Sequence, residues 1–503
     1  MKKNVLALSI ATMIGGLGFA GAASADVVRM TASTAIDLSL AEGGVGHALI
    51  VPYFNAQNGN MTVLHVVNTD TTSGKAVKVR FRGAANSDDI LDFQVFMSPG
   101  DVWTAAVTAG ADGIAQLVTA DNTCTLPKLT AGVAQPFITG RLNPALTGDA
   151  LANQTREGYV EIFNMADIPA NPAATSLYTA IKHKNGVAPC TSTALDATLT
   201  NITTEAGVLA AGFAAPTGTL MGDWYIQNVA GTTTFSGAAT AVVATTAAGI
   251  SAPSNFVHFP QMDQGATAAG NTADPLLLSG AVVTANYDLP DLSTPFVTAP
   301  GAGAAVDQAA KLTHALAVKS ASNQFANDAG IFAKTDWVFS MPTRRYSVAM
   351  NYTKLNSTDA ATRALAREYT VLTSNWFTAA NTTIDGQLIC VNADKQTFWD
   401  REENSKATGA VFSPDTVKVT RFCGETSVMS FGVAKTDPSV LGASVAREAV
   451  LPGYVNGWGQ VSTNNGGNGL PILGASFIKL SNANATPGVS GTYGITWPHR
   501  FTK

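Results

Sequence analysis

Acidic side chains carry the chemistry that this sequence offers most directly. They fall into three groups: Asp88 with Asp89 and Asp92, Asp288 with Asp291, and Asp400 with Glu402 and Glu403. Two carboxylates facing each other across a cleft are enough for glycoside hydrolysis. Several carboxylate oxygens together also suit calcium, although the D-x-D-x-D-G frame of an EF-hand is absent. We therefore take Asp88, Asp89 and Asp92 as candidate calcium ligands, with a solvated turn as the simpler structural reading of each group.

Other catalytic patterns are missing from the sequence. The histidines occur at positions 47, 65, 183, 258, 314 and 499, and none falls in an H-E-x-x-H frame. The sequence also lacks a G-x-S-x-G elbow, a P-loop and a dinucleotide fingerprint. We identify no catalytic residue and predict that the protein is not an enzyme.

Four cysteines form two local groups, Cys124 with Cys190 and Cys390 with Cys423. Three pairings are open to four cysteines, and the local pairing is the one we expect in an exported chain, where disulfides persist. Such bridges stabilise a fold by roughly 2 to 4 kcal/mol. Free or metal-bound thiols are the alternative, although no C-x-x-C spacing supports it.

Tryptophans could supply platforms on which sugars stack. Trp224 and Trp337 lie in strand-like patterns and are expected in the core. Trp458 is the best candidate for an exposed aromatic side chain, but one such residue does not make a lectin.

The elements that position these residues are mostly predicted strands. Residues 46–54 and 61–68 read as strands joined by a turn at 58–60, which predicts a hairpin. Residues 76–82 alternate apolar and basic side chains, which predicts one buried and one wet face. Short strands separated by turns favour a mainly β fold with antiparallel, Ig-like β-sandwich domains.

A few short helices and irregular segments complete the prediction. Helix-like composition occurs at 307–318 and 357–371, whereas the Ala, Thr and Gly stretches at 189–219 and 231–253 are expected as loops rather than small-residue strands. The predicted organisation is an N-terminal β-sandwich region with loop insertions over 26–262, an irregular linker over 263–305, and a C-terminal β-rich region over 306–503.

The first 25 residues have the form of a secretory signal peptide. Lys2 and Lys3 precede a short apolar run, and small residues lead to an expected cleavage between Ala25 and Asp26. No later apolar run reaches the 18 to 20 or so residues that a membrane-spanning helix needs. The sequence therefore predicts an extracellular or cell-surface location.

Charged residues make up 13% of the chain, about half the usual share, and the formal net charge is −5. Phosphate-backbone binding needs clustered Lys and Arg, so nucleic acid is not an expected partner. Small polar residues take the place of the missing charged residues, as in secreted β proteins and self-assembling coats.

Two further segments carry a family resemblance. Residues 81–93 with 97–103, and residues 334–345, resemble secreted cell-surface proteins of Gram-negative proteobacteria, including surface-layer proteins that coat cells and vesicle-filled tubes in betaproteobacteria. The resemblance implies a β-rich subunit that assembles with copies of itself outside the outer membrane, and it transfers no catalytic residues.

Low surface charge lowers the desolvation cost of repeated contacts, and edge strands offer backbone pairing between subunits. An outer-membrane surface component is a second expected partner, and calcium the candidate cofactor. The alternative function is a secreted carbohydrate-binding adhesin or glycan-active enzyme.

Overall fold

A computed structural model describes residues 27–261, 289–301, 303–369, 376–407, 421–463, 465–486 and 489–503. The expected signal peptide at 1–25, with its cleavage pair Ala25 and Asp26, lies outside these residues, as do most of the expected linker and Asp288.

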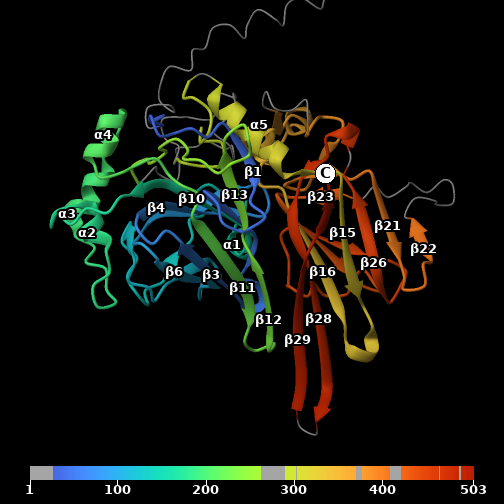
Figure 1. The fold of residues 1–503 in the computed structure, drawn as a ribbon. Coiled ribbons are helices and arrows are strands. Elements are labelled where there is room, and N and C mark those ends of the chain that lie inside the picture. Colours follow the sequence, from blue (N-terminus) through green and yellow to red (C-terminus); the bar gives the residue numbers. More distant parts are fainter. Residues whose placement is uncertain are drawn as a thin grey trace, which may run out of the picture.

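The N-terminal half is built on two antiparallel sheets (Figure 1). The first, in spatial order, contains β1 (Asp37–Leu40), β13 (Thr240–Thr245), β2 (Ala48–Asn55), β10 (Glu157–Ile168), β4 (Gly74–Gly83), β5 (Asp89–Met97) and β8 (Cys124–Leu126). The second contains β12 (Thr233–Ala238), β11 (Leu220–Asn228), β3 (Asn60–Asn68), β6 (Val102–Ala109), β7 (Ala115–Val118) and β9 (Gln135–Pro136).

The first sheet is buried on both faces, which makes this half three layers thick. In β2, Leu49 and Val51 join the apolar core against the second sheet, while Ile50 faces a separate core on the other side. That outer core is completed by irregular segments such as 289–298 and by helices. A strand with both faces covered reads as a continuous apolar run, as β2 does.

The C-terminal half contains two five-stranded sheets. One has the order β22 (Ser405–Ala407), β21 (Lys395–Trp399), β26 (Asn456–Ser462), β15 (Ser320–Ala326) and β30 (Arg500–Thr502). The other has the order β25 (Arg447–Val450), β24 (Thr426–Phe431), β16 (Lys334–Ser340), β28 (Leu473–Thr486) and β29 (Val489–Pro498), antiparallel except for the β24 and β25 pair.

Smaller strand groups extend the C-terminal half. They are β19 (Thr382–Asp385), β20 (Leu388–Asn392) and β23 (Arg421–Cys423), then β17 (Val348–Met350) with β18 (Arg367–Tyr369), and β14 (Ala317–Val318) with β27 (Leu470–Pro471).

The two halves pack through the sheet that contains β16. Trp337 and Phe339 of β16 point into the C-terminal core, whereas Val338 between them belongs to the core of the N-terminal half. Phe477 of β28 likewise reaches into the N-terminal half, where it contacts the rings of Tyr53 and Trp224. The halves therefore share apolar core, and the sheet from β22 to β30 is left as an outer layer of the molecule (Figure 1).

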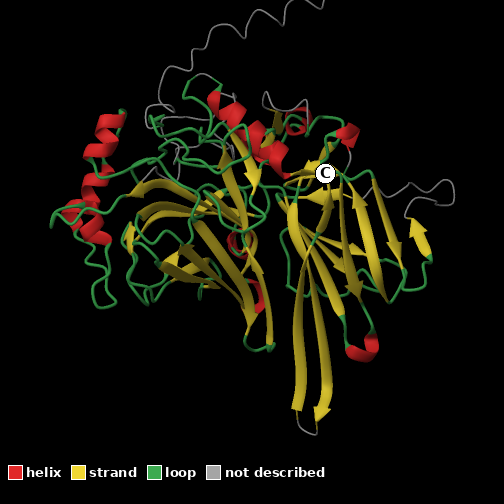
Figure 2. Cartoon of the chain, viewed as in Figure 1, coloured by secondary structure: helices red, strands yellow, loops and turns green. Residues whose placement is uncertain are grey.

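The helices are short, and α2 and α5 contribute apolar side chains to the outer core of the N-terminal half (Figure 2). They are α1 (Gly148–Thr155), α2 (Leu177–Ile181), α3 (Ser192–Asp196), α4 (Glu205–Ala210), α5 (Ala304–Leu316), α6 (Tyr352–Leu355) and α7 (Ala360–Ala364). The prediction of a mainly β protein with antiparallel sheets and a few short helices is confirmed.

Several local predictions need correction. The predicted hairpin is wrong, because β2 pairs with β10 and β13 whereas β3 pairs with β6 and β11 in the facing sheet. Asn58 and Gly59, both at positive φ, turn the chain from one sheet to the other. The stretch 231–253 forms β12 and β13 rather than a loop, and 189–219 contains α3 and α4. The helix expected at 357–371 is limited to α7, and β18 follows it.

Candidate functional site

The basic face of β4, predicted to be wet, is instead fully buried. Lys78, Arg80 and Arg82 alternate along the strand, and each side chain has no exposed area. Gln261, the segment 289–298 and the turn after β16 cover them. The prediction was wrong because apolar–basic alternation looks the same whether the basic face meets water or meets carboxylates from distant parts of the chain.

Arg82 and Arg345 share two buried carboxylates at the centre of this cover. The Arg345 Nη2 atom lies 3.0 Å from an Asp291 oxygen and 3.5 Å from a Glu161 oxygen. Arg82 reaches the same oxygens at 3.8 and 3.5 Å. Burial favours the neutral form of Asp291, but Arg345, Arg82 and Arg80 outweigh it and hold its pKa at about 2.

A second buried pair extends the network into the C-terminal half. Arg344 Nε lies 2.6 Å from a Glu425 oxygen, and its Nη1 and Nη2 atoms donate to the carbonyls of Ile389 and Ala85. Because Ala85 lies in the N-terminal half, this arginine ties the two halves together. Removal of one partner of such a buried pair is costly, because it leaves the other charge buried without compensation.

The candidate calcium ligands are placed beside this network, and their carboxylates have separate partners. Asp92 pairs with Lys78 and also accepts from Gln261, whereas Asp89 lies 3.5 Å from Arg80. Asp88 accepts a 2.5 Å hydrogen bond from the Tyr352 hydroxyl. Over the described residues these three carboxylates do not form a metal-ligating group, and calcium binding by them stays a prediction of the sequence.

Burial dominates the ionisation of Asp88, which is 2% exposed. It raises the pKa of the Asp88 carboxyl to about 7, against the opposing effects of Tyr352 and Arg82. This side chain is therefore poised to change its charge near neutral pH.

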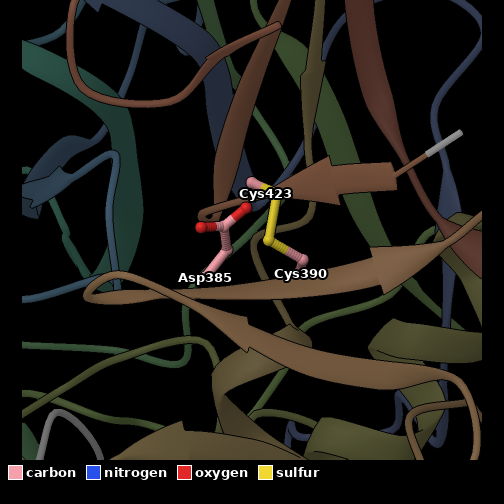
Figure 3. Close-up of side chains that lie close together, drawn as sticks. All are labelled: Asp385, Cys390 and Cys423. Atoms are coloured by element: carbon pink, nitrogen blue, oxygen red, sulfur yellow. A yellow bond between two sulfur atoms is a disulfide. The ribbon is translucent and has the colours of Figure 1, made fainter. Parts of the chain in front are cut away.

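One cluster of potential metal ligands occurs among the described residues, at Asp385, Cys390 and Cys423 (Figure 3). The two sulfur atoms are bonded to each other, so no thiolate is available for a metal. The Asp385 carboxylate lies 2.8 Å from Arg421. The cluster is thus a disulfide beside an ion pair.

The predicted cysteine pairing is confirmed. Cys124 bonds to Cys190, and Cys390 bonds to Cys423 between the adjacent strands β20 and β23. Such bridges are typical of proteins outside the cytoplasm.

The remaining acidic groups also have local explanations. Asp291 belongs to the buried network, and Asp400 lies in an exposed turn where its carboxylate accepts from the backbone of Glu402 and Asn404. Asp291 is buried and the Asp400 carboxylate lies in an exposed turn, so these two described groups do not face each other across a cleft, and Asp288 lies outside the described residues.

A projecting hairpin is the most unusual feature of the surface. β28 pairs with β16 only as far as Lys479, but it continues to Thr486 beside β29. Figure 1 shows these two strands reaching well past the other sheets. We call residues 480–486 and 489–493 the arm.

The base of the arm is held against the N-terminal half. A Cβ atom added to Gly494 would lie 2.1 Å from the Thr234 carbonyl oxygen, so the absence of a side chain allows β29 to pass close to β12. The Ser236 amide also donates to the Thr496 hydroxyl at 3.2 Å. The arm therefore leaves the body from an anchored position.

Along the described chain, no helix has both the length and the apolar character needed to cross a membrane. The chain matches no protein-family model, no curated protein and no solved structure.

Proposed function

We propose that this is an exported structural protein whose copies assemble into a coat on the outside of the outer membrane. The arm is the observation that carries the proposal. It presents two antiparallel strands beyond the body, and β29 is the edge strand of its sheet.

An edge strand offers a row of backbone N–H and C=O groups to another strand. Past Lys479 the outer side of β28 adds a second such row, since β16 no longer accompanies it. Tyr493, which is 62% exposed, adds an aromatic side chain at the same place. Folded proteins usually cover or shorten exposed edges, so an extended arm favours pairing with another copy.

Other features are compatible with a coat subunit. The low charge content reduces the cost of repeated contacts, and the two disulfides suit an oxidising environment. Calcium as a bridging ion, an outer-membrane component as the attachment partner and an Ig-like type of sandwich remain parts of the proposal.

Shortening the arm tests this function. Leu480 and Tyr493 face each other in register, so replacing residues 481–492 by Asn-Gly closes a tight hairpin at the edge of the body. We expect the shortened protein to sediment as a monomer at concentrations where the parent protein forms large assemblies, with an unchanged melting temperature. Val433→Ser is the matched control, because it removes a 76% exposed apolar side chain elsewhere. Assembly by the shortened protein equal to that of the parent would contradict the proposal.

A further inference from the structure

A groove lies at β15, where the sheet from β22 to β30 meets the end of β29 of the other five-stranded sheet. Its volume is about 270 Å³, and its walls are Trp458 of β26 and Trp497 at the end of β29. Gln324 and Ser322 of β15 and Arg500 of β30 complete the lining, with Gln324 opposite Trp458 and Ser322 opposite Arg500 in the strand register. The groove thus combines two indoles with hydrogen-bonding groups and one cation.

The indole of Trp458 is held in place by stacking on a side chain of the adjacent strand. It stands opposite Trp399 of β21, and the two rings stack with centroids 4.1 Å apart and planes at 8°. On its other side Trp458 stands opposite Gln324 of β15. One face of the indole is therefore covered by Trp399, and the opposite face is turned toward the groove.

Both walls are open to solvent. Trp458 is 41% exposed and Trp497 is 46% exposed, although tryptophan is one of the most thoroughly buried residue types on average. Two exposed indoles lining one groove form an apolar binding surface that the fold itself does not use. The expectation that Trp458 is the exposed aromatic is met, and the structure adds the second ring.

The groups between and beside the indoles are donors and acceptors. The Gln324 side chain is exposed and makes no hydrogen bond within the described part of the chain, so its amide is free for a ligand. The Ser322 hydroxyl is held by Gln460 at 3.3 Å. Arg500 donates one N–H to the Pro498 carbonyl, and the described residues that line the groove include no carboxylate that would neutralise it.

We propose that the groove binds an acidic glycan, with a pyranose ring between Trp458 and Trp497 and its carboxylate at Arg500. The flat C–H face of a sugar ring stacks on an indole, and its hydroxyls suit an amide and a hydroxyl at one edge. A guanidinium binds a carboxylate through charge-assisted hydrogen bonds, which selects an acidic sugar over a neutral one. The proposal is independent of coat assembly, because the groove lies outside the arm.

Tryptophan fluorescence and calorimetric titration with defined oligosaccharides test the assignment. The acidic probes are oligomers of galacturonate and of mannuronate, and the neutral probes are cello- and galacto-oligosaccharides of equal length. We expect an acidic probe to bind at least about tenfold more tightly than the neutral ones. Equal binding of neutral probes, or no binding of either acidic probe at millimolar concentration, would overturn the proposal.

Variants locate the binding on this groove. Trp497→Ala and Arg500→Gln leave the stacked pair of Trp458 and Trp399 in place, and each is expected to weaken binding of the acidic probe about tenfold or more. Arg500→Gln should also remove the preference for the acidic probe. Phe332→Ala is the control, because it removes a 58% exposed aromatic side chain that belongs neither to the groove lining nor to the arm. Unchanged binding by Trp497→Ala would contradict the assignment, and retained binding by the protein with the shortened arm would separate this site from coat assembly.

Discussion

Replacing Asp88 by Asn should remove a pH-dependent loss of stability. Asp88 is buried between the halves, where it accepts from Tyr352, and its Oδ1 atom has no hydrogen-bond partner among the described residues. An Asn oxygen can accept the same hydrogen bond without acquiring a charge. The substitution therefore isolates the cost of ionising this one group.

The sign and size follow from the pKa of Asp88. Burial raises that pKa from 3.8 to about 7, so the folded protein holds this proton more tightly than the unfolded chain does. The associated stability is fully present below about pH 4 and is lost as the pH rises through about 7. The difference between a pKa of 3.8 and one of about 7, at 1.36 kcal/mol for each pH unit, corresponds to a loss of up to about 4 kcal/mol.

Urea unfolding at a series of pH values from about 4 to 8 measures the effect. As the pH rises over this range, the parent protein should lose up to about 4 kcal/mol of unfolding free energy relative to Asp88→Asn. Glu42→Gln, at an exposed position, serves as the control and should show almost no such trend. A difference that stays constant between pH 4 and 8 would refute the reasoning.

Three further predictions concern stability. Arg345→Met leaves Arg82 as the remaining shared cation of Asp291 and Glu161, so urea unfolding should show a loss of about 3 kcal/mol, the low end for a broken buried pair. The double variant that also replaces Asp291 by Asn should recover part of this loss. Cys423→Ser opens the bridge to Cys390 and should lower the unfolding free energy by roughly 3 to 4 kcal/mol; a change under about 1 kcal/mol would count against a stabilising role. Burial, aided by the charge of Lys78, lowers the pKa of His258 to about 3. The contribution of neutral His258 to folding stability is therefore present above about pH 6.5 and is lost on acidification, at up to about 1.4 kcal/mol per pH unit. In melting experiments at pH 4 to 7, His258→Phe should resist acid better than the parent protein.

Local patterns in the sequence predicted the features that depend on near neighbours. Strand-like patterns separated by turns predicted a mainly β fold, and the spacing of the cysteines favoured the pairing that the structure contains. Trp224 and Trp337 are buried as expected, at 2% and 0% exposure, whereas Trp458 is exposed. Each of these predictions depends on the residue and its immediate surroundings.

Features that depend on distant segments were missed. The charge of Arg82 is balanced by Glu161 and by Asp291, which lies more than 200 positions away in the chain, and nothing within β4 indicates that Asp291 covers it. Likewise, Asn58 and Gly59 suit a tight hairpin as well as a crossover between sheets. The groove was missed because Trp458 and Trp497 come from two different sheets, on β26 and β29, which come together only in the folded protein.

Electron microscopy of the purified, disulfide-bonded protein tests the central claim of self-assembly most directly. Grids are prepared with calcium and with a chelator, for both the parent protein and the protein with the shortened arm. The account predicts ordered sheets or tubes of the parent protein in calcium, their loss on chelation, and none from the shortened protein. Dispersed monomers of the parent protein under both conditions would contradict it.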